Sequence, residues 1–308
     1  MTTIRNGLRD STDILDNPAA LRARAHEDGY LFFRDLLGRD AVLRARHDIL
    51  EICRKYGWIS PDTDPDEGIA DHDTVNAIDP LAIAECGVGI PKDAYREVQK
   101  LESFHRLAHT PGLVELYRKL FETDVLVHPR NIARVMLPLD TASPTPPHQD
   151  YIHIQGTKNV WTCWAPIGDI PRTLGGLSVL RGSNRDGLLP VKAAEGAGSL
   201  QVYLCGVDYE WIEHDYRAGD ALTFTSLTVH KAIPNQQRDR IRLSCDFRFQ
   251  PAHEEVEEQS LHPHCNVMGW DDMYEGWSDP SLQYYWKQFD LQMANWDESI
   301  RWQKENIC

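Results

Sequence analysis

Residues 240–249 alternate strictly between polar and apolar side chains. Because strand side chains point to opposite faces at every step, this alternation predicts a β-strand with one polar and one apolar face. The polar face has two interpretations: a solvated surface, or the wall of a pocket on a strand that helices cover from the other side. The polar set is Arg240, Arg242, Ser244, Asp246 and Arg248, and the apolar set is Ile241, Leu243, Cys245, Phe247 and Phe249.

Shorter runs rich in β-branched and aromatic residues predict five more strands, separated by turns that contain Gly and Pro. Many short strands with tight turns are typical of a closed or double-sheet barrel. The predicted fold is therefore mainly β with flanking helices, and its core over residues 124–250 is a double-stranded β-helix, that is, a cupin-like jelly roll. The five strands are predicted at residues 125–128, 131–137, 159–165, 176–180 and 221–229.

The N-terminal part, residues 18–121, is predicted to be mostly helical. Residues 18–25 are rich in helix formers, and residues 95–120 carry apolar side chains at helical spacing. Residues 30–33 form a short predicted strand between helices. In residues 41–57 apolar side chains also recur with helical spacing, so one side of that helix is expected to be buried.

Residues 59–95 change character, with several prolines and many aspartates. Such a stretch predicts either a solvent-exposed connector or a lid-like loop that covers a substrate. The chain has 308 residues, which is long enough for one domain with a sizeable core. We therefore expect a single domain over residues 1–308.

The tail, residues 254–308, contains five of the nine tryptophans. Residues 280–289 and 295–304 are predicted to be helical, so the tail is expected to be an aromatic helical extension. Aromatic residues at this density either pack onto the domain or form a homodimer surface.

The composition is that of an ordinary globular protein, with 42% hydrophobic and 26% charged residues. The net charge of −15 argues against general binding to nucleic acid or to anionic membranes, because both need basic patches. The chain contains neither a signal-like start nor an apolar run of membrane-spanning length, so we expect a cytoplasmic protein. Seven cysteines without a C-x-x-C pair predict reduced thiols.

The triplet from His148 to Asp150 follows two prolines. Because His148 and Asp150 are two positions apart, an extended chain places the imidazole and the carboxylate on the same side, where both can bind one metal ion. His230, at the end of a later predicted strand, would add a second imidazole. Two imidazoles and one carboxylate on one face leave the other positions of an octahedron open, as in non-heme Fe(II) oxygenases. A cluster at His262, His264 and Cys265 has no second ligand pair with zinc-finger spacing and is expected to be a surface loop.

An arginine on the polar face of the 240–249 strand can hold a dicarboxylate through a planar two-point contact. Arg242 is the first candidate, with the hydroxyl of Ser244 beside it, and Arg240 is the alternative. Trp164 is a candidate aromatic wall of the same pocket. These residue types fit a 2-oxoglutarate site.

In order and spacing, these motifs resemble the phytanoyl-CoA dioxygenase family of Fe(II)- and 2-oxoglutarate-dependent oxygenases, from about residue 20 to about residue 250. Two positions depart from the family's glycine-rich turn, since Arg181 stands where Pro is usual and Asn184 where His is usual. The segments that carry the resemblance are residues 25–37, 145–150, 175–184, 219–230, 234–235 and 242–244.

The resemblance implies that His148, Asp150 and His230 bind Fe(II), that Arg242 pairs with the far carboxylate of the cosubstrate 2-oxoglutarate, and that O2 is the oxidant. It further implies hydroxylation, or another oxidation at a C–H bond, of a small to mid-sized metabolite in biosynthetic tailoring, with release of succinate and CO2. Related halogenases have a small residue at the position of Asp150. Its carboxylate therefore favours hydroxylation, desaturation or ring formation over halogenation.

Gln149 lies within the triplet and Tyr151 and His153 follow it, and all three are expected to contact the small-molecule substrate. Two other functions fit the same residues. One is a cupin-type metalloenzyme that does not use 2-oxoglutarate, and the other is a non-catalytic jelly-roll binding protein.

Overall fold

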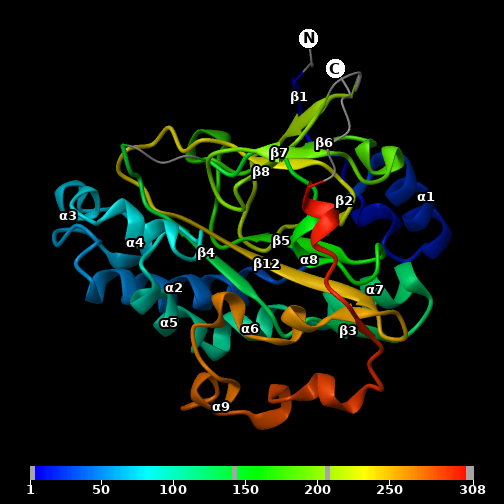
Figure 1. Cartoon of the computed structure of the whole chain (residues 1–308). Helices are drawn as coiled ribbons and strands as arrows, with labels where there is room; N and C mark the ends of the chain where they lie inside the picture. The colour runs from blue at the N-terminus through cyan, green and yellow to red at the C-terminus, as the bar shows by residue number, and fades with distance from the viewer. Residues whose placement is uncertain (1–3, 141–143, 205–208, 303–308) are drawn as a thin grey trace.

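The structure of the protein is a computed structural model that describes residues 4–140, 144–204 and 209–302. Its strands form two main sheets (Figure 1). The larger sheet has the order β2–β10–β5–β12–β3, and β4 also pairs with β12. Its strands are β2 (Tyr30–Phe33), β3 (Val125–Val127), β4 (Ile132–Met136), β5 (Trp161–Pro166), β10 (Ala221–Thr225) and β12 (Arg242–Pro251).

The smaller sheet has the order β1–β9–β6–β11. A cluster of buried side chains from both sheets, including Trp164, Val179 and Phe224, lies between them. The smaller sheet consists of β1 (Ile4–Asn6), β6 (Leu177–Leu180), β9 (Trp211–Glu213) and β11 (His230–Ala232). Two short pairs are β7 (Val191–Ala193) with β8 (Leu200–Val202), and β13 (Val256–Glu257) with β14 (Met293–Ala294).

The N-terminal helices pack on the outer face of the larger sheet, where Figure 1 shows α2 and α6 beside β12 and β4. The α-helices are α1 (Pro18–Asp28), α2 (Arg39–Lys55), α3 (His72–Asn76), α4 (Pro80–Ala84), α5 (Lys92–Gln99), α6 (Glu102–Leu107), α7 (Pro111–Phe121), α8 (Tyr151–Ile154) and α9 (Trp270–Met273).

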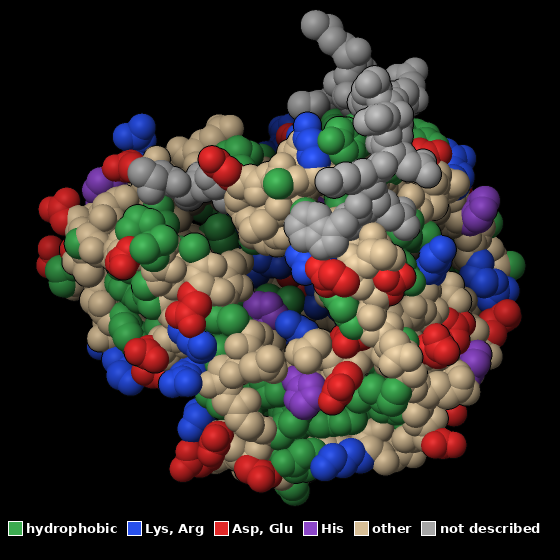
Figure 2. Space-filling model, viewed as in Figure 1, with side chains coloured by type: hydrophobic (Ala, Val, Ile, Leu, Met, Phe, Trp, Pro, Cys, Tyr) green, Lys and Arg blue, Asp and Glu red, His purple; other side chains and the backbone are tan. Residues whose placement is uncertain are grey.

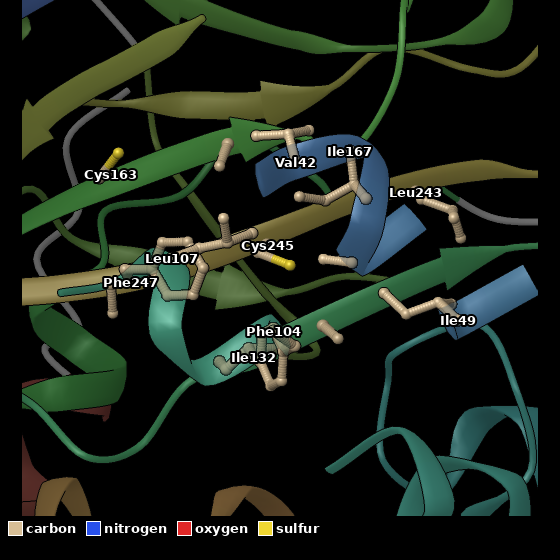
Figure 3. Packing of buried hydrophobic residues seen from close by; sticks show 14 of the residues in the cluster. Val42, Ile49, Phe104, Leu107, Ile132, Cys163, Ile167, Leu243, Cys245 and Phe247 are labelled. Atoms are coloured by element: carbon tan, nitrogen blue, oxygen red, sulfur yellow. The ribbon is translucent and has the colours of Figure 1, made fainter. Parts of the chain in front are cut away.

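The apolar face of β12 holds these helices in place. Figure 3 shows Cys245 and Phe247 of β12 packed with Phe104 of α6 and Val42 of α2, and all four side chains are fully buried. Burying a side chain the size of Phe247 contributes roughly 1.5–3 kcal/mol. The outer face of the larger sheet is therefore buried against the N-terminal helices.

Every residue of β12 is buried, including its polar face. Since helices cover the apolar face, the polar side chains point into the space between the two sheets. Of the two interpretations of the alternating strand, the pocket wall is correct. The buried polar residues of β12 that alternate with the apolar set are Arg242, Ser244, Asp246 and Arg248.

The turn from α1 into β2 explains the Asp-Gly-Tyr step of the sequence. Gly29 ends α1 with a positive φ of 76°, which a glycine adopts without strain. A Cβ atom on Gly29 would lie 2.6 Å from the Oδ1 atom of Asn184, in the loop after β6. Gly29 thus allows α1 to pack closely against the glycine-rich turn.

The architecture confirms the mainly β fold with flanking helices, although its two sheets do not close into a barrel over the described residues. One strand boundary was wrong. The predicted strand over residues 221–229 ends at Thr225, the chain turns, and His230 begins β11 in the opposite sheet. That turn carries His230 from one sheet to the other.

The predicted helices at residues 280–289 and 295–304 were wrong over the part that the structure describes, and residues 303–304 lie outside it. Short 3-10 turns at Pro280–Leu282, Tyr285–Gln288 and Glu298–Trp302 replace them. Tyr284 has a left-handed backbone with φ 52°, which interrupts any helix.

Contacts with the rest of the domain, and not helical propensity, determine the conformation of the tail. Its aromatic side chains pack on Leu126 of β3 and on Ala252 and Val256, which follow β12. This packing accounts for the aromatic density of the described tail and lends no support to the homodimer surface expected from the sequence.

The expectation of reduced thiols holds for three buried cysteines and fails for one pair. Cys53, Cys163 and Cys245 are free core residues, whereas Cys86 and Cys265 form a disulfide. The remaining two, Cys205 and Cys308, lie outside the described residues. The bond joins positions 179 residues apart, a pairing that spacing along the chain does not reveal. It ties the segment 262–265, expected to be a surface loop, to the segment after α4.

The stretch 59–95 is not a plain loop, since it contains α3, α4 and the first turn of α5. Asp71 and Asp79 begin the two short helices by accepting hydrogen bonds from backbone N–H groups, which explains why aspartates recur there. No described helix is both long and apolar enough to cross a membrane.

Candidate metal centre

The backbone brings His148 and His230 together directly. Each donates its backbone N–H to the carbonyl oxygen of the other at 3.0 Å, which forms an isolated antiparallel bridge. Asp150 lies two residues beyond His148, at the start of α8. His148 thus lies not on a regular strand but at a single pairing between the chain segment 144–150 and β11.

Backbone carbonyls orient both imidazoles. Nδ1 of His148 lies 2.8 Å from the carbonyl oxygen of Pro146, and Nδ1 of His230 lies 3.0 Å from that of Thr228. With Nδ1–H donating in each ring, both Nε2 atoms keep a free lone pair for a metal ion. They lie 3.7 and 3.8 Å from Oδ1 of Asp150.

These three side chains, whose ligand atoms all lie within 4.8 Å of one another, are the only group of three or more His, Cys, Asp or Glu residues in the described part of the chain that could hold a metal ion. Two ligands at right angles on one ion, each about 2.1 Å from it, are about 3 Å apart. The ligand atoms thus need to move by less than about 1 Å to share one ion. All three side chains are buried.

The charge of Asp150 is stabilised inside the protein. Burial alone would raise its pKa, but the guanidinium of Arg248, 3.9 Å away, and the two imidazoles outweigh burial and hold the pKa well below its usual range. The hydroxyl of Thr162 donates a hydrogen bond to Oδ2 of Asp150 at 2.5 Å. Burial and the nearby His230 lower the pKa of His148 far below its usual range. Asp150 is therefore a carboxylate and His148 a neutral imidazole, the forms that bind metals.

The triad opens into a cavity of about 750 Å³, which we call the large chamber. Figure 2 shows a hollow near the centre of this face of the molecule, with Lys or Arg and His side chains visible inside it. Apolar and aromatic side chains line much of the large chamber, including Ile83, Met136, Leu139, Trp164 and Phe224.

Of the two candidate arginines for 2-oxoglutarate, Arg242 lines the large chamber and Arg240 does not. Arg242 lines the large chamber and donates a hydrogen bond to Oγ of Ser244 at 2.6 Å. Burial, together with the nearby Arg134, lowers the pKa of Arg242 to about 10, so the guanidinium stays charged at neutral pH. Arg240 instead donates to the backbone carbonyl of Glu67 and does not line this cavity.

The three residues predicted to contact the substrate have different surroundings. Gln149 is fully buried, and its side-chain amide donates to the carbonyls of Gly187 and Leu227, so it fixes the backbone and does not face the cavity. Tyr151 is half-buried and does not line the cavity either. His153 lies in α8 and lines a smaller chamber next to the triad.

Sequence reasoning missed two residues that act on Asp150. Thr162 on β5 and Arg248 on β12 lie directly opposite each other in the paired strands, so both side chains reach the same carboxylate. The alternating pattern did place Arg248 on the same face as Arg242. It contained no signal for the distance to Asp150, which depends on how β5 and β12 align.

Part of the segment 59–95 forms a wall of the site. Asn76, Ile83 and Cys86 line the large chamber together with the triad. These residues come from α3, α4 and the loop after α4. Of the two interpretations of the segment, the substrate-covering one is favoured by this placement.

A family model described as phytanoyl-CoA dioxygenase (PhyH) matches residues 25–243. The chain belongs to the phytanoyl-CoA dioxygenase family. The matched region is well over half of the chain and includes the triad and Arg242.

Two curated proteins of similar sequence are both named 1-deoxypentalenic acid 11-beta-hydroxylase. The one from Streptomyces arenae is 27% identical over 265 residues, which covers 82% of this chain and 88% of that protein. The one from Streptomyces exfoliatus is 26% identical over the same length and with the same coverage.

Solved structures share the fold at low sequence identity. The epimerase SnoN, crystallised with Fe³⁺, alpha ketoglutarate and nogalamycin RO, has a TM-score of 0.54 at 20% identity, covering 78% of this chain and 87% of that chain. The alpha ketoglutarate dependent carbocyclase SnoK from nogalamycin biosynthesis has a TM-score of 0.50 at 18% identity, covering 81% and 89%.

Proposed function

We propose that this member of the phytanoyl-CoA dioxygenase family is an Fe(II)- and 2-oxoglutarate-dependent oxygenase that hydroxylates a small to mid-sized metabolite in a biosynthetic pathway. The observation that carries the proposal is the meeting of His148, Asp150 and His230 beside a cavity that also contains Arg242. The two curated proteins of similar sequence are also named hydroxylases, which supports this reaction type.

The donor set fits ferrous iron. Two imidazole nitrogens and one carboxylate oxygen on one side of an ion form the facial triad of non-heme Fe(II) oxygenases. The backbone carbonyls of Pro146 and Thr228 fix the ring orientations before any metal binds. When bound, Fe(II) supplies the activation of O2, which is coupled to oxidative decarboxylation of 2-oxoglutarate.

The reaction balances with one oxygen atom of O2 in each of the two organic products, the alcohol and succinate. The substrate C–H, 2-oxoglutarate and O2 give the alcohol, succinate and CO2. The guanidinium of Arg242 and the hydroxyl of Ser244 bind the far carboxylate of 2-oxoglutarate, and Trp164 forms a wall of that site. The apolar side chains of the large chamber exclude water and hold the carbon skeleton of the metabolite.

The decisive experiment is metal loading followed by turnover. The purified protein is loaded with Fe(II) without oxygen, then given 2-oxoglutarate, and succinate is measured after O2 is admitted. We expect one bound iron per chain and succinate formation that requires 2-oxoglutarate.

His148→Ala should lose both properties, whereas His26→Ala, at an exposed position on α1, should keep both. Iron binding without any use of 2-oxoglutarate would instead indicate a metalloenzyme of another class. Lack of iron binding would indicate a binding protein.

A further inference from the structure

The triad adjoins a second cavity that the proposed cosubstrate does not need. This small chamber has a volume of about 270 Å³ and shares eight lining residues with the large chamber, among them Arg134, His148 and Asp150. Arg242 lines only the large chamber, and Arg248 lines only the small one. The two arginines are six residues apart on β12, about 20 Å along a strand. One strand thus carries an arginine into each chamber.

Arginines supply the positive charge of the small chamber. Arg130, Arg134 and Arg248 line it, and Asp150 is its one acidic residue among the described ones. Arg134 is already paired, since its Nε lies 2.7 Å from Oδ2 of Asp246.

Two of the histidines that line the small chamber, His128 and His264, are uncharged at neutral pH. Burial lowers the pKa of His128 to about 3 and that of His264 far below its usual range. The unbalanced charge is therefore that of Arg130 and Arg248.

Neither guanidinium is hydrogen-bonded to a carboxylate among the described residues. Arg248 is 7% exposed, its Nε has no hydrogen-bond partner, and its nearest carboxylate, that of Asp150, is 3.9 Å away. Arg130 donates to the backbone carbonyl of Gln259, and no described carboxylate lies within ion-pair distance of it. Burial first, and then repulsion from Arg248, lower the pKa of Arg130 to about 10. An anion between the two side chains would relieve the repulsion between them and supply the missing hydrogen bond of Arg248.

We propose that the small chamber binds a carboxylate of the organic substrate through Arg130 and Arg248, so that the substrate of this enzyme is a carboxylic acid. A planar carboxylate matches the fork of a guanidinium in a two-point contact. Asp150 already balances part of the charge of Arg248, which leaves enough for a singly charged group. The carbon skeleton then extends past the triad into the large chamber. This inference rests on the proposed function and adds the substrate class to it.

Matched pairs of acids and amides test the inference without turnover. Cyclohexanecarboxylate and adamantane-1-carboxylate are titrated into the Ni(II)-loaded protein saturated with 2-oxoglutarate, and each is compared with its neutral amide by calorimetry. We expect at least one acid to bind about 10- to 100-fold more tightly than its amide, the range that charge-assisted hydrogen bonds give.

Arg130→Gln should remove the preference for the acid and leave the affinity for 2-oxoglutarate within about twofold, because this residue contacts neither the triad nor Arg242. Arg240→Gln is the matched control, since that arginine lies outside both chambers and should leave both affinities unchanged. Arg130→Lys keeps the charge without the fork and should retain part of the preference.

Three outcomes would overturn the inference: no acid binds more tightly than its amide, Arg130→Gln keeps the preference, or inorganic phosphate binds more tightly than either acid. Loss of 2-oxoglutarate binding in Arg130→Gln would show that the small chamber is the cosubstrate site, which also overturns it. If Arg130→Gln does not fold, the acid and amide comparison on the unmodified protein and Arg130→Lys still decides. Failure of 2-oxoglutarate to bind the unmodified protein would be seen separately and counts against the proposed function alone.

Discussion

Replacing Thr162 by Val should weaken metal binding without disturbing the core. Valine has nearly the shape of threonine, and Thr162 is 2% exposed on β5, so packing is kept while the hydroxyl is lost. The hydroxyl donates to Oδ2 of Asp150, the one carboxylate of the triad. Its loss leaves one oxygen of a buried charge without that hydrogen bond.

The expected size follows from the partners that remain. A hydrogen bond to a charged group contributes about 1.5–3 kcal/mol. Arg248 still lies 3.9 Å from Asp150 and compensates in part, so the lower half of that range applies. A loss of about 1.5–2 kcal/mol corresponds to about 10- to 30-fold weaker metal affinity. Removing a group that hydrogen-bonds to a metal ligand typically weakens metal affinity by about 10- to 100-fold.

Titration of Ni(II) or of Fe(II) under anaerobic conditions measures this affinity. Thr162→Ser, which keeps the hydroxyl, should bind metal nearly as the unmodified protein does. Thr223→Val is the matched control, because Thr223 is equally buried on the neighbouring strand and its hydroxyl bonds with Tyr117 on the helix side of the sheet. That variant should lose about 1 kcal/mol of stability and no metal affinity. Equal metal affinity in Thr162→Val and the unmodified protein would refute the reasoning.

Three further results are expected. Arg242→Ala should weaken 2-oxoglutarate binding by about 10- to 100-fold in a titration of the metal-loaded protein, whereas Arg240→Ala should leave it unchanged; equal effects would contradict the assignment. Gly89→Ala should lower the free energy of unfolding in urea by about 1–3 kcal/mol, more than Gly38→Ala, because both have positive φ but only at Gly89 would a Cβ meet a backbone oxygen, at 2.3 Å. Burial lowers the pKa of His105 to about 4, so this ring stays neutral in the folded protein and takes up a proton on unfolding below pH about 6.5. The free energy of unfolding should therefore fall as the pH drops from about 6.5 to 4, by at most about 3 kcal/mol for this residue. His105→Gln should reduce this fall. An equal reduction in His26→Gln, at an exposed position, would argue against burial as the cause.

The local pattern of the sequence predicted most of the larger sheet and the residues of the triad. The alternating pattern identified β12 because its apolar side chains pack against the helices and its polar side chains point between the two sheets. The triplet at His148 and the glycine-rich turns were recognised because each depends on a few neighbouring residues. The family and the fold followed from their order along the chain.

Features that depend on long-range packing were not predictable in the same way. The tail lost its predicted helices because its aromatic side chains contact β3 and the residues after β12, and those contacts decide its path. The disulfide between Cys86 and Cys265 and the approach of Thr162 and Arg248 to Asp150 each join distant segments. No local pattern in the sequence marks them.

The direct pairing of His148 with His230 has a consequence for how the protein acquires its ion. The two backbone hydrogen bonds and the two carbonyl contacts of the rings are all present before metal arrives. Loading should then cost little conformational entropy, and the apoprotein should keep its secondary structure through repeated removal and return of iron. Each cycle with a chelator should leave the circular dichroism spectrum unchanged while the melting temperature moves down and back up.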